Sequence, residues 1–179
     1  MGEACRGQGR QRLHYVRGPG AGMCAADIRI APVLKGIDPL LGPELLAILR
    51  AMGHGDEIVI ADANFPATAN AHRLVRADGI TATAMVRAVV SVLPLDDFVP
   101  AAAFRMAVTG APEETPPVIN DFAAALAAQG YRRPIEAIER FAFYERAKTA
   151  YAILATGEVR LWGNLILKKG VIRPPSAHP

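Results

Sequence analysis

Cysteine is absent from most of this chain. The only two of its 179 residues that are cysteines, Cys5 and Cys24, lie within residues 1–32. Residues 33–179 therefore have neither a disulfide framework nor a thiolate metal site, which is typical of a reducing compartment. No His-x-x-x-His pair or carboxylate-rich cluster predicts another kind of metal site. We accordingly expect a cytoplasmic protein without a bound metal.

Long hydrophobic runs are also missing, although 51% of the residues are hydrophobic and only 21% are charged. The apolar run from Ile80 to Leu95 is interrupted by Arg87 and Ser91, well before the ~20 residues that a membrane crossing needs. The N-terminal segment lacks the continuous apolar stretch of a secretory signal. The sequence thus predicts a soluble protein with no membrane partner.

An excess of positive charge is absent outside the N-terminal segment. The formal net charge is +3, and five of the 20 basic but only two of the 17 acidic residues lie within residues 1–32. The other 147 residues carry equal numbers of each sign, which excludes a general nucleic-acid-binding surface. Residues 1–32 are also glycine-rich and without hydrophobic pattern, so we expect them to be disordered or a non-native extension.

What remains has the pattern of one α/β domain. A chain of this length fits a single domain, for which we expect residues 33–172, followed by a tail over 173–179. The alternation of segments indicates a mixed central sheet with helices on both faces. The predicted helices cover 43–52, 81–93, 118–129 and 141–147, and the predicted strands cover 57–61, 74–76, 103–108, 135–138 and 151–155, with two further short strands on either side of Trp162-Gly163-Asn164.

One histidine stands out in this pattern. His54 lies between Gly53 and Gly55, directly ahead of a short apolar strand that ends at Asp62. Glycine on either side leaves the imidazole uncovered and permits a positive φ, so the ring can project into a cleft. An exposed imidazole is suited to proton transfer near neutral pH. The alternative is that Gly53 only ends the preceding helix and His54 is an ordinary surface residue.

Four blocks of sequence, in order, resemble a known family. They are VLKGIDP at 33–39, MGHGDEIVIAD at 52–62, IERFAFYERA at 138–147 and GNLILKKG at 163–170. Together they are similar to the L-fucose mutarotase branch of the ribose pyranase/fucose mutarotase (RbsD/FucU) family, over about residues 33–172. The resemblance implies an RbsD-like fold. It also implies a cofactor-free enzyme that interconverts the α and β anomers of a free sugar.

The resemblance assigns roles to particular residues. It implies that His54 is the catalytic acid/base and that Asp62, Arg140 and the Trp162-Gly163-Asn164 segment bind the sugar. Each binding residue has a structural alternative: a turn for Asp62 and Asn164, a salt bridge for Arg140, and core packing for Trp162. The chain departs from the family at Trp162, where tyrosine is common, and at Asn64, where some members have histidine.

The resemblance extends to assembly and to the start of the chain. It implies a homo-oligomer, a decamer of two stacked pentamers, with each site near a subunit boundary. Family members typically begin with Met-Leu-Lys where this chain has Val33-Leu34-Lys35, so residues 1–32 are expected to precede the functional chain. Two other functions stay open: a D-ribose pyranase and a non-catalytic sugar-binding assembly module.

Chain geometry restricts how such a site can form. Eight residues separate His54 from Asp62, so a fully extended chain would place them up to about 26 Å apart, at ~3.3 Å per residue. A monosaccharide spans far less. Either the His54 loop folds back toward the end of the strand, or the pocket combines these groups across a subunit boundary.

Overall fold

The structure, a computed structural model, describes residues 33–174, so the expectations for residues 1–32 and 175–179 lie outside it. Within the described range, no helix has the length and apolar character that a membrane span requires. The elements in chain order are α1 (Pro43–Ala51), β1 (Glu57–Ala61), α2 (Ala67–Asn70), β2 (Leu74–Ala77), α3 (Ala82–Val90), β3 (Ala103–Met106), α4 (Pro117–Ala128), β4 (Ile135–Ile138), α5 (Arg140–Thr149), β5 (Ala152–Thr156) and β6 (Leu165–Lys168).

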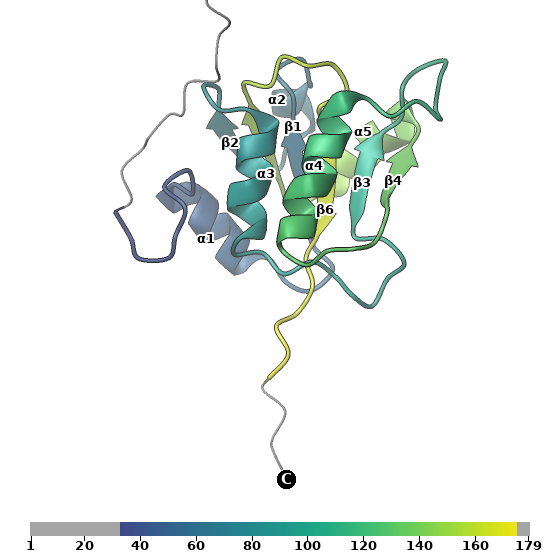
Figure 1. Cartoon of the computed structure of the whole chain (residues 1–179). Coiled ribbons are helices and arrows are strands. Elements are labelled where there is room, and N and C mark those ends of the chain that lie inside the picture. The colour runs from purple at the N-terminus through teal and green to yellow at the C-terminus, as the bar shows by residue number, and fades with distance from the viewer. Residues whose placement is uncertain (1–32, 175–179) are drawn as a thin grey trace, which may run out of the picture.

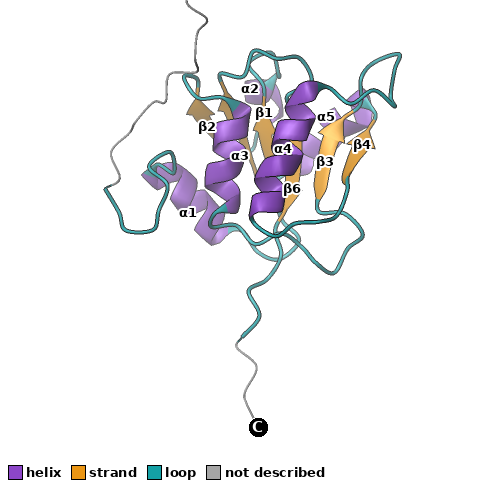
Figure 2. Cartoon of the chain, viewed as in Figure 1, coloured by secondary structure: helices purple, strands orange, loops and turns teal. Residues whose placement is uncertain are grey.

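The six strands form one mixed sheet, as the sequence predicts. Their order is β2-β5-β1-β6-β3-β4, and Figure 2 shows them in orange between the helices. β6 runs antiparallel to its neighbours β1 and β3, whereas the other three pairs are parallel. The last strand of the chain therefore lies inside the sheet, and β1, β3, β4 and β5 all end at the same edge.

Helices cover both faces of the sheet because side chains alternate along each buried strand. Ile58 and Ile60 of β1 belong to a core cluster shared with α1, α3 and α4. Val59 and Ala61 point the other way, into a second cluster with α2 and α5. Figure 1 shows α3 and α4 side by side on one face and α5 behind the sheet. The predicted two-faced α/β architecture is confirmed.

The prediction of a strand on each side of Trp162-Gly163-Asn164 is wrong on one side. Only β6 follows this segment, and the residues between β5 and β6 form a loop. Trp162 has a positive φ of 64°, which no β-strand accommodates. The short helix α2 lies between two predicted strands, where no helix was predicted, and α3 is shorter at both ends than the predicted 81–93.

Candidate active site

His54 lies in an exposed loop, as predicted. The N–H of Gly55 donates to the carbonyl of Lys169 (2.9 Å), and the N–H of Lys169 donates to the carbonyl of Asp56 (2.8 Å). These bonds hold the loop against the end of β6 and leave the His54 side chain 47% exposed. Of the two flanking glycines, only Gly55 has a positive φ, at 86°. Gly53 therefore does not adopt the positive φ that its glycine backbone permits.

The imidazole has a carboxylate partner that sequence reasoning missed. Nε2 of His54 lies 3.3 Å from Oδ1 of Asp96, whose side chain is only 4% exposed. Burial alone raises the pKa of Asp96, but the N–H of Phe98 and the His54 ring outweigh it and lower that pKa overall. The Phe98 ring centroid lies 5.5 Å from that of His54. Nothing in the sequence distinguishes Asp96 from the adjacent Asp97, so only the fold reveals the pair.

A close backbone approach places Asp96 beside the His54 loop. The N–H of Asp96 donates to the carbonyl of Lys168 (3.1 Å), and that of Gly170 donates to the carbonyl of Pro94 (2.8 Å). A Cβ atom on Gly170 would lie only 2.5 Å from the carbonyl oxygen of Leu95. The glycine that ends the GNLILKKG block is therefore required for this contact.

A cavity of about 520 Å³ opens beside His54. Its walls are mainly apolar side chains of α1 and of the segments around Pro94 and Val171, with Arg50 and Lys169 at its border. This volume is within the range of small-molecule sites. A small molecule can therefore approach the imidazole from this side.

Asp62 lies at the other end of β1, where it is buried and paired with Asn164. Its N–H donates to Oδ1 of Asn164 (2.9 Å), and Nδ2 of Asn164 donates to Oδ2 of Asp62 (2.7 Å). Oδ1 of Asp62 also accepts the N–H of Asn64 (2.9 Å), so the turn role is present as well. Burial raises the pKa of Asp62, in spite of the hydrogen bonds from Asn64 and Asn164.

Trp162 and Gly163 complete this cluster, which we call the sugar-side cluster (Asp62 and Trp162–Asn164). Trp162 is half-buried and packs against the core cluster of α2 and α5, so its core-packing role is real. A Cβ atom on Gly163 would lie 2.8 Å from Cγ of Glu158 and 3.5 Å from Cβ of Asp62. Glycine at 163 thus allows the turn to lie directly against Asp62.

Arg140 begins α5 at the same edge of the sheet. Its guanidinium lies 4.8 Å from the centroid of the Phe141 ring, and no ion pair within residues 33–174 involves it, contrary to the salt-bridge alternative. It borders a cavity of about 390 Å³ together with the buried Arg105. Nε of Arg140 and Nη1 of Arg105 are buried without a hydrogen-bond partner, so both can donate to a polar ligand.

The predicted site residues fall at two opposite edges of the sheet. The sugar-side cluster and Arg140 lie where the parallel strands end, although β6 and β3 separate Arg140 from β1 by roughly 14 Å, at about 4.8 Å per strand. His54 lies at the far end of β1, roughly 16 Å away at about 3.3 Å per residue. In Figure 1 the chain leaves β6 toward the bottom, whereas α2 and the loop entering β6 lie at the top. The alternative in which the His54 loop folds back is wrong.

Comparison with known sequences shows the family to which the chain belongs. A profile described as the RbsD / FucU transport protein family matches residues 35–172. The chain belongs to the RbsD/FucU family. A fucose mutarotase of Bos taurus is 46% identical over 148 residues, covering 79% of this chain and 96% of the relative. An L-fucose mutarotase of Glaesserella parasuis is 45% identical over 140 residues, covering 78% and 96%.

A solved RbsD/FucU structure extends this similarity to the fold. The fucose mutarotase of Streptococcus pneumoniae in complex with L-fucose has a TM-score of 0.73 and 40% identity to this chain. The match covers 78% of this chain and all of the other.

Across the residues that the structure describes, no group of three or more His, Cys, Asp or Glu side chains could hold a metal ion.

Proposed function

We propose that this protein interconverts the α and β anomers of L-fucose. The observation that carries the proposal is that a His–Asp pair at one end of β1 and an Asp–Asn pair at the other occur in a chain 46% identical to a fucose mutarotase. The first pair can move protons, and the second offers fixed donors and acceptors for sugar hydroxyls. We propose further that the protein acts in the cytoplasm.

Anomer exchange needs only one well-placed proton shuttle. A base takes the proton of the O1 hydroxyl while the ring oxygen O5 gains one, so the C1–O5 bond breaks and an open-chain aldehyde forms. Rotation about C1–C2 presents the other face of the aldehyde, and O5 attacks C1 as the protons return. His54 serves as this shuttle because neutral imidazole accepts a proton and imidazolium donates one. Asp96 holds the orientation of the His54 imidazole.

The sugar-side cluster holds the sugar during this exchange, and Arg140, which lies roughly 14 Å from β1 in its own chain, joins it from a neighbouring subunit, as His54 does. Asp62 and Asn164 bind hydroxyls, the guanidinium of Arg140 donates to oxygens, and Trp162 covers an apolar face of the ring. Because β1 separates His54 from Asp62 within one chain, each working site takes His54 from one subunit and the sugar-side cluster from its neighbour. The homo-oligomer that this requires is the decamer implied by the family resemblance.

Exchange-NMR of equilibrated L-fucose and D-ribose tests the function. We expect wild-type protein to accelerate anomer exchange of L-fucose, and His54→Ala to lower that acceleration by about 10²–10⁴-fold, the usual contribution of a general acid/base. His72→Ala is the matched control, since His72 is also an exposed histidine but lies on the loop after α2.

Three outcomes would contradict the proposal. Greater acceleration for D-ribose than for L-fucose would favour the pyranase alternative. Binding of L-fucose without acceleration would favour the non-catalytic module. Equal acceleration by wild type and His54→Ala would remove His54 from the mechanism.

A further inference from the structure

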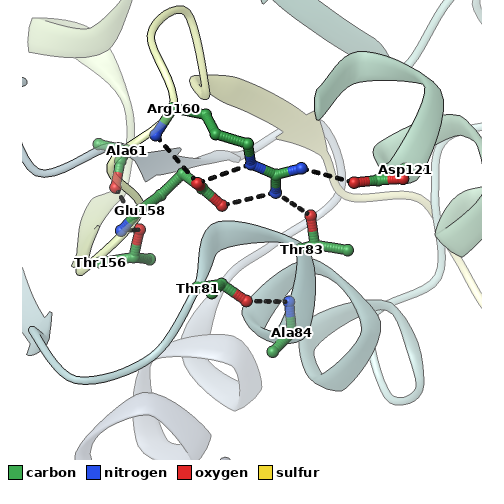
Figure 3. A network of polar contacts seen from close by, with 8 residues as sticks. All are labelled: Ala61, Thr81, Thr83, Ala84, Asp121, Thr156, Glu158 and Arg160. Carbon is green, nitrogen blue, oxygen red and sulfur yellow. Dashed lines mark hydrogen bonds and ion pairs between the residues drawn. The ribbon is translucent and has the colours of Figure 1, made fainter. Parts of the chain in front are cut away.

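The buried Glu158 and the exposed Arg160 form an ion pair next to the sugar-side cluster. Glu158 is only 2% exposed, and its carboxylate accepts two parallel hydrogen bonds from Arg160, Nε to Oε1 and Nη2 to Oε2, both 2.8 Å long. Nη1 of Arg160 donates to Oδ2 of Asp121 on α4 (2.6 Å), and Nη2 also donates to Oγ1 of Thr83 on α3 (3.1 Å). Figure 3 shows how this guanidinium joins the loop before β6 to both helices.

The backbone and side chain of Glu158 also lie against the chain around Asp62 and Gly163. The carbonyl of Glu158 accepts the N–H of Ala63, the residue after Asp62 (2.9 Å). A Cβ atom on Gly163 would lie 2.8 Å from Cγ of Glu158 and 3.1 Å from the carbonyl oxygen of Arg160. Glu158 therefore supports both chain segments that carry the sugar-side cluster. It is buried beneath them and does not face the sugar.

Apart from Trp162, the large apolar side chains of this loop are not buried. Val159 and Leu161, on either side of Arg160, are 79% and 66% exposed. Trp162 is nevertheless in the left-handed region, with φ 64°, and is the one non-glycine residue among 33–174 with a positive φ. A conformation of this kind persists only where surrounding contacts determine it. In this loop, those contacts include the hydrogen bonds of Glu158 and Arg160, beside the packing of Trp162 and the Asp62–Asn164 hydrogen bonds.

We propose that the Glu158–Arg160 pair is a positioning device for sugar recognition, holding Asp62 and the Trp162–Asn164 turn in place without touching the sugar. The proposal rests on the proposed function. It predicts that loosening the pair weakens sugar binding more than it slows the proton transfer at His54. It also predicts that the planar fork of arginine matters, because lysine offers only a point charge on a flexible stem.

Tryptophan fluorescence can report the conformation of this loop directly, because Trp162 is the single tryptophan of the chain. Its fluorescence emission and its quenching by acrylamide report the conformation of this loop alone. We would compare wild type with Arg160→Met and Arg160→Lys. Arg87→Met is the matched control, since Arg87 is an exposed arginine on the same helix α3 that carries Thr83.

For Arg160→Met we expect the KM for L-fucose to rise about tenfold or more, as for the loss of a charged hydrogen bond, while kcat changes less. Acrylamide quenching of Trp162 should increase, and far-UV circular dichroism should stay unchanged. Arg160→Lys should fall between wild type and Arg160→Met, and Arg87→Met should match wild type. If Arg160→Met does not fold, Glu158→Gln, which keeps the size of the buried side chain, is expected to raise KM and quenching in the same direction.

Two results would overturn the proposal. One is wild-type KM and quenching in Arg160→Met. The other is a fall in kcat for Arg160→Met with no change in KM, which would indicate a general loss of active protein. A wild-type protein without anomer-exchange activity would instead contradict the proposed function, and the quenching series would still show whether the pair holds the loop.

Discussion

The two ends of β1 differ in how they hold their polar groups. At the start of the strand, His54 is exposed beside a mainly apolar cavity and has one buried carboxylate partner, Asp96. At the end of the strand, Asp62 and Asn164 are buried and exchange two hydrogen bonds, with Glu158 and Arg160 behind them. The first end is open to a ligand, whereas the polar groups of the second end are held in place by hydrogen bonds to one another.

This difference matches the two tasks of the proposed reaction. A proton shuttle has to be accessible and to exist in two protonation states, so it is best placed at an open surface. For groups that orient a sugar, the entropic cost of binding is lowest when they are already held in place before the sugar binds. One strand thus carries both kinds of group, but at ends too far apart to serve the same sugar.

The largest expected effect concerns whether the two ends cooperate between subunits. His54→Ala and Asp62→Ala should each lose most of the anomer-exchange activity, by about a hundredfold or more for the histidine. Assemblies made by co-expressing the two variants should regain about one quarter of the wild-type activity, because about one in four shared sites then receives both intact halves. Exchange-NMR on the separately tagged, doubly purified assemblies measures this.

The mixed assemblies could also contradict a site that is shared between subunits. If both ends of β1 acted within one chain, no combination of the two variants would contain an intact site. Activity no higher than that of the single variants, in assemblies shown to contain both chains, would therefore contradict a shared site.

The next largest effect tests the carboxylate beside His54. Asp96→Asn should lower kcat by about tenfold to a hundredfold, because the imidazole loses the charged group that orients it, and should leave the KM for L-fucose nearly unchanged. Asp97→Asn is the matched control, since Asp97 is the adjacent, exposed aspartate, paired with Arg173. Similar losses in both variants would indicate that Asp96 has no special role.

A smaller effect concerns the close backbone contacts at each end. Gly170→Ala and Gly157→Ala should each reduce the free energy of unfolding by about 1–3 kcal/mol, because their Cβ atoms would lie 2.5 Å from Leu95 O and 2.0 Å from Asp78 O. Gly53→Ala should change it by less than about 0.5 kcal/mol, since its Cβ would make ordinary contact at 3.6 Å. Urea unfolding of the three variants ranks them, and an equal loss in all three would contradict the structure.

The smallest expected effect is the acid response of the second end. The hydrogen bond from Arg160, above all, lowers the pKa of Glu158 from its ordinary value of 4.5, although burial opposes the shift. A lowered pKa means that this carboxylate stabilises the fold above that value and loses its contribution as the pH falls through the folded-state pKa. Urea unfolding between pH 7 and pH 3 should therefore show a shallower decline for Glu158→Gln than for wild type. Identical declines would contradict the pKa assignment.

Much of the fold could be predicted because the relevant signals are local. A continuous run of buried residues marks β1, and Pro43 marks the start of α1. The alternation of helices and strands indicates a two-faced sheet. The position of β6 inside the sheet could not be predicted this way. Strand order depends on contacts between segments far apart in the chain, such as Ile58 of β1 beside Leu167 of β6.

The candidate site divides in the same manner. His54 could be selected from its glycine-flanked motif, whereas Asp62, Arg140 and the Trp162–Asn164 segment were selected through the family resemblance. The structure brings Asp62 and the Trp162–Asn164 segment together through the Asp62–Asn164 hydrogen bonds. Asp96 could not be selected, because it approaches His54 only where the chain after α3 meets the end of β6. Arg160 lies in the segment ahead of Trp162 that the sequence predicts as a short strand, so its pairing with Glu158 could not be predicted.

The sequence alone therefore determined the fold class, the neutral charge of residues 33–179 and the residue types of the site, since composition, periodicity and short motifs are properties of the chain itself. The tertiary structure decided where these residues stand. A rigid strand holds its two ends apart, so β1 separates the imidazole from the sugar-side cluster. Burial and hydrogen bonds from other segments set the direction in which the pKa values of Asp62 and Asp96 shift, and contacts with α3 and α4 hold the loop before β6.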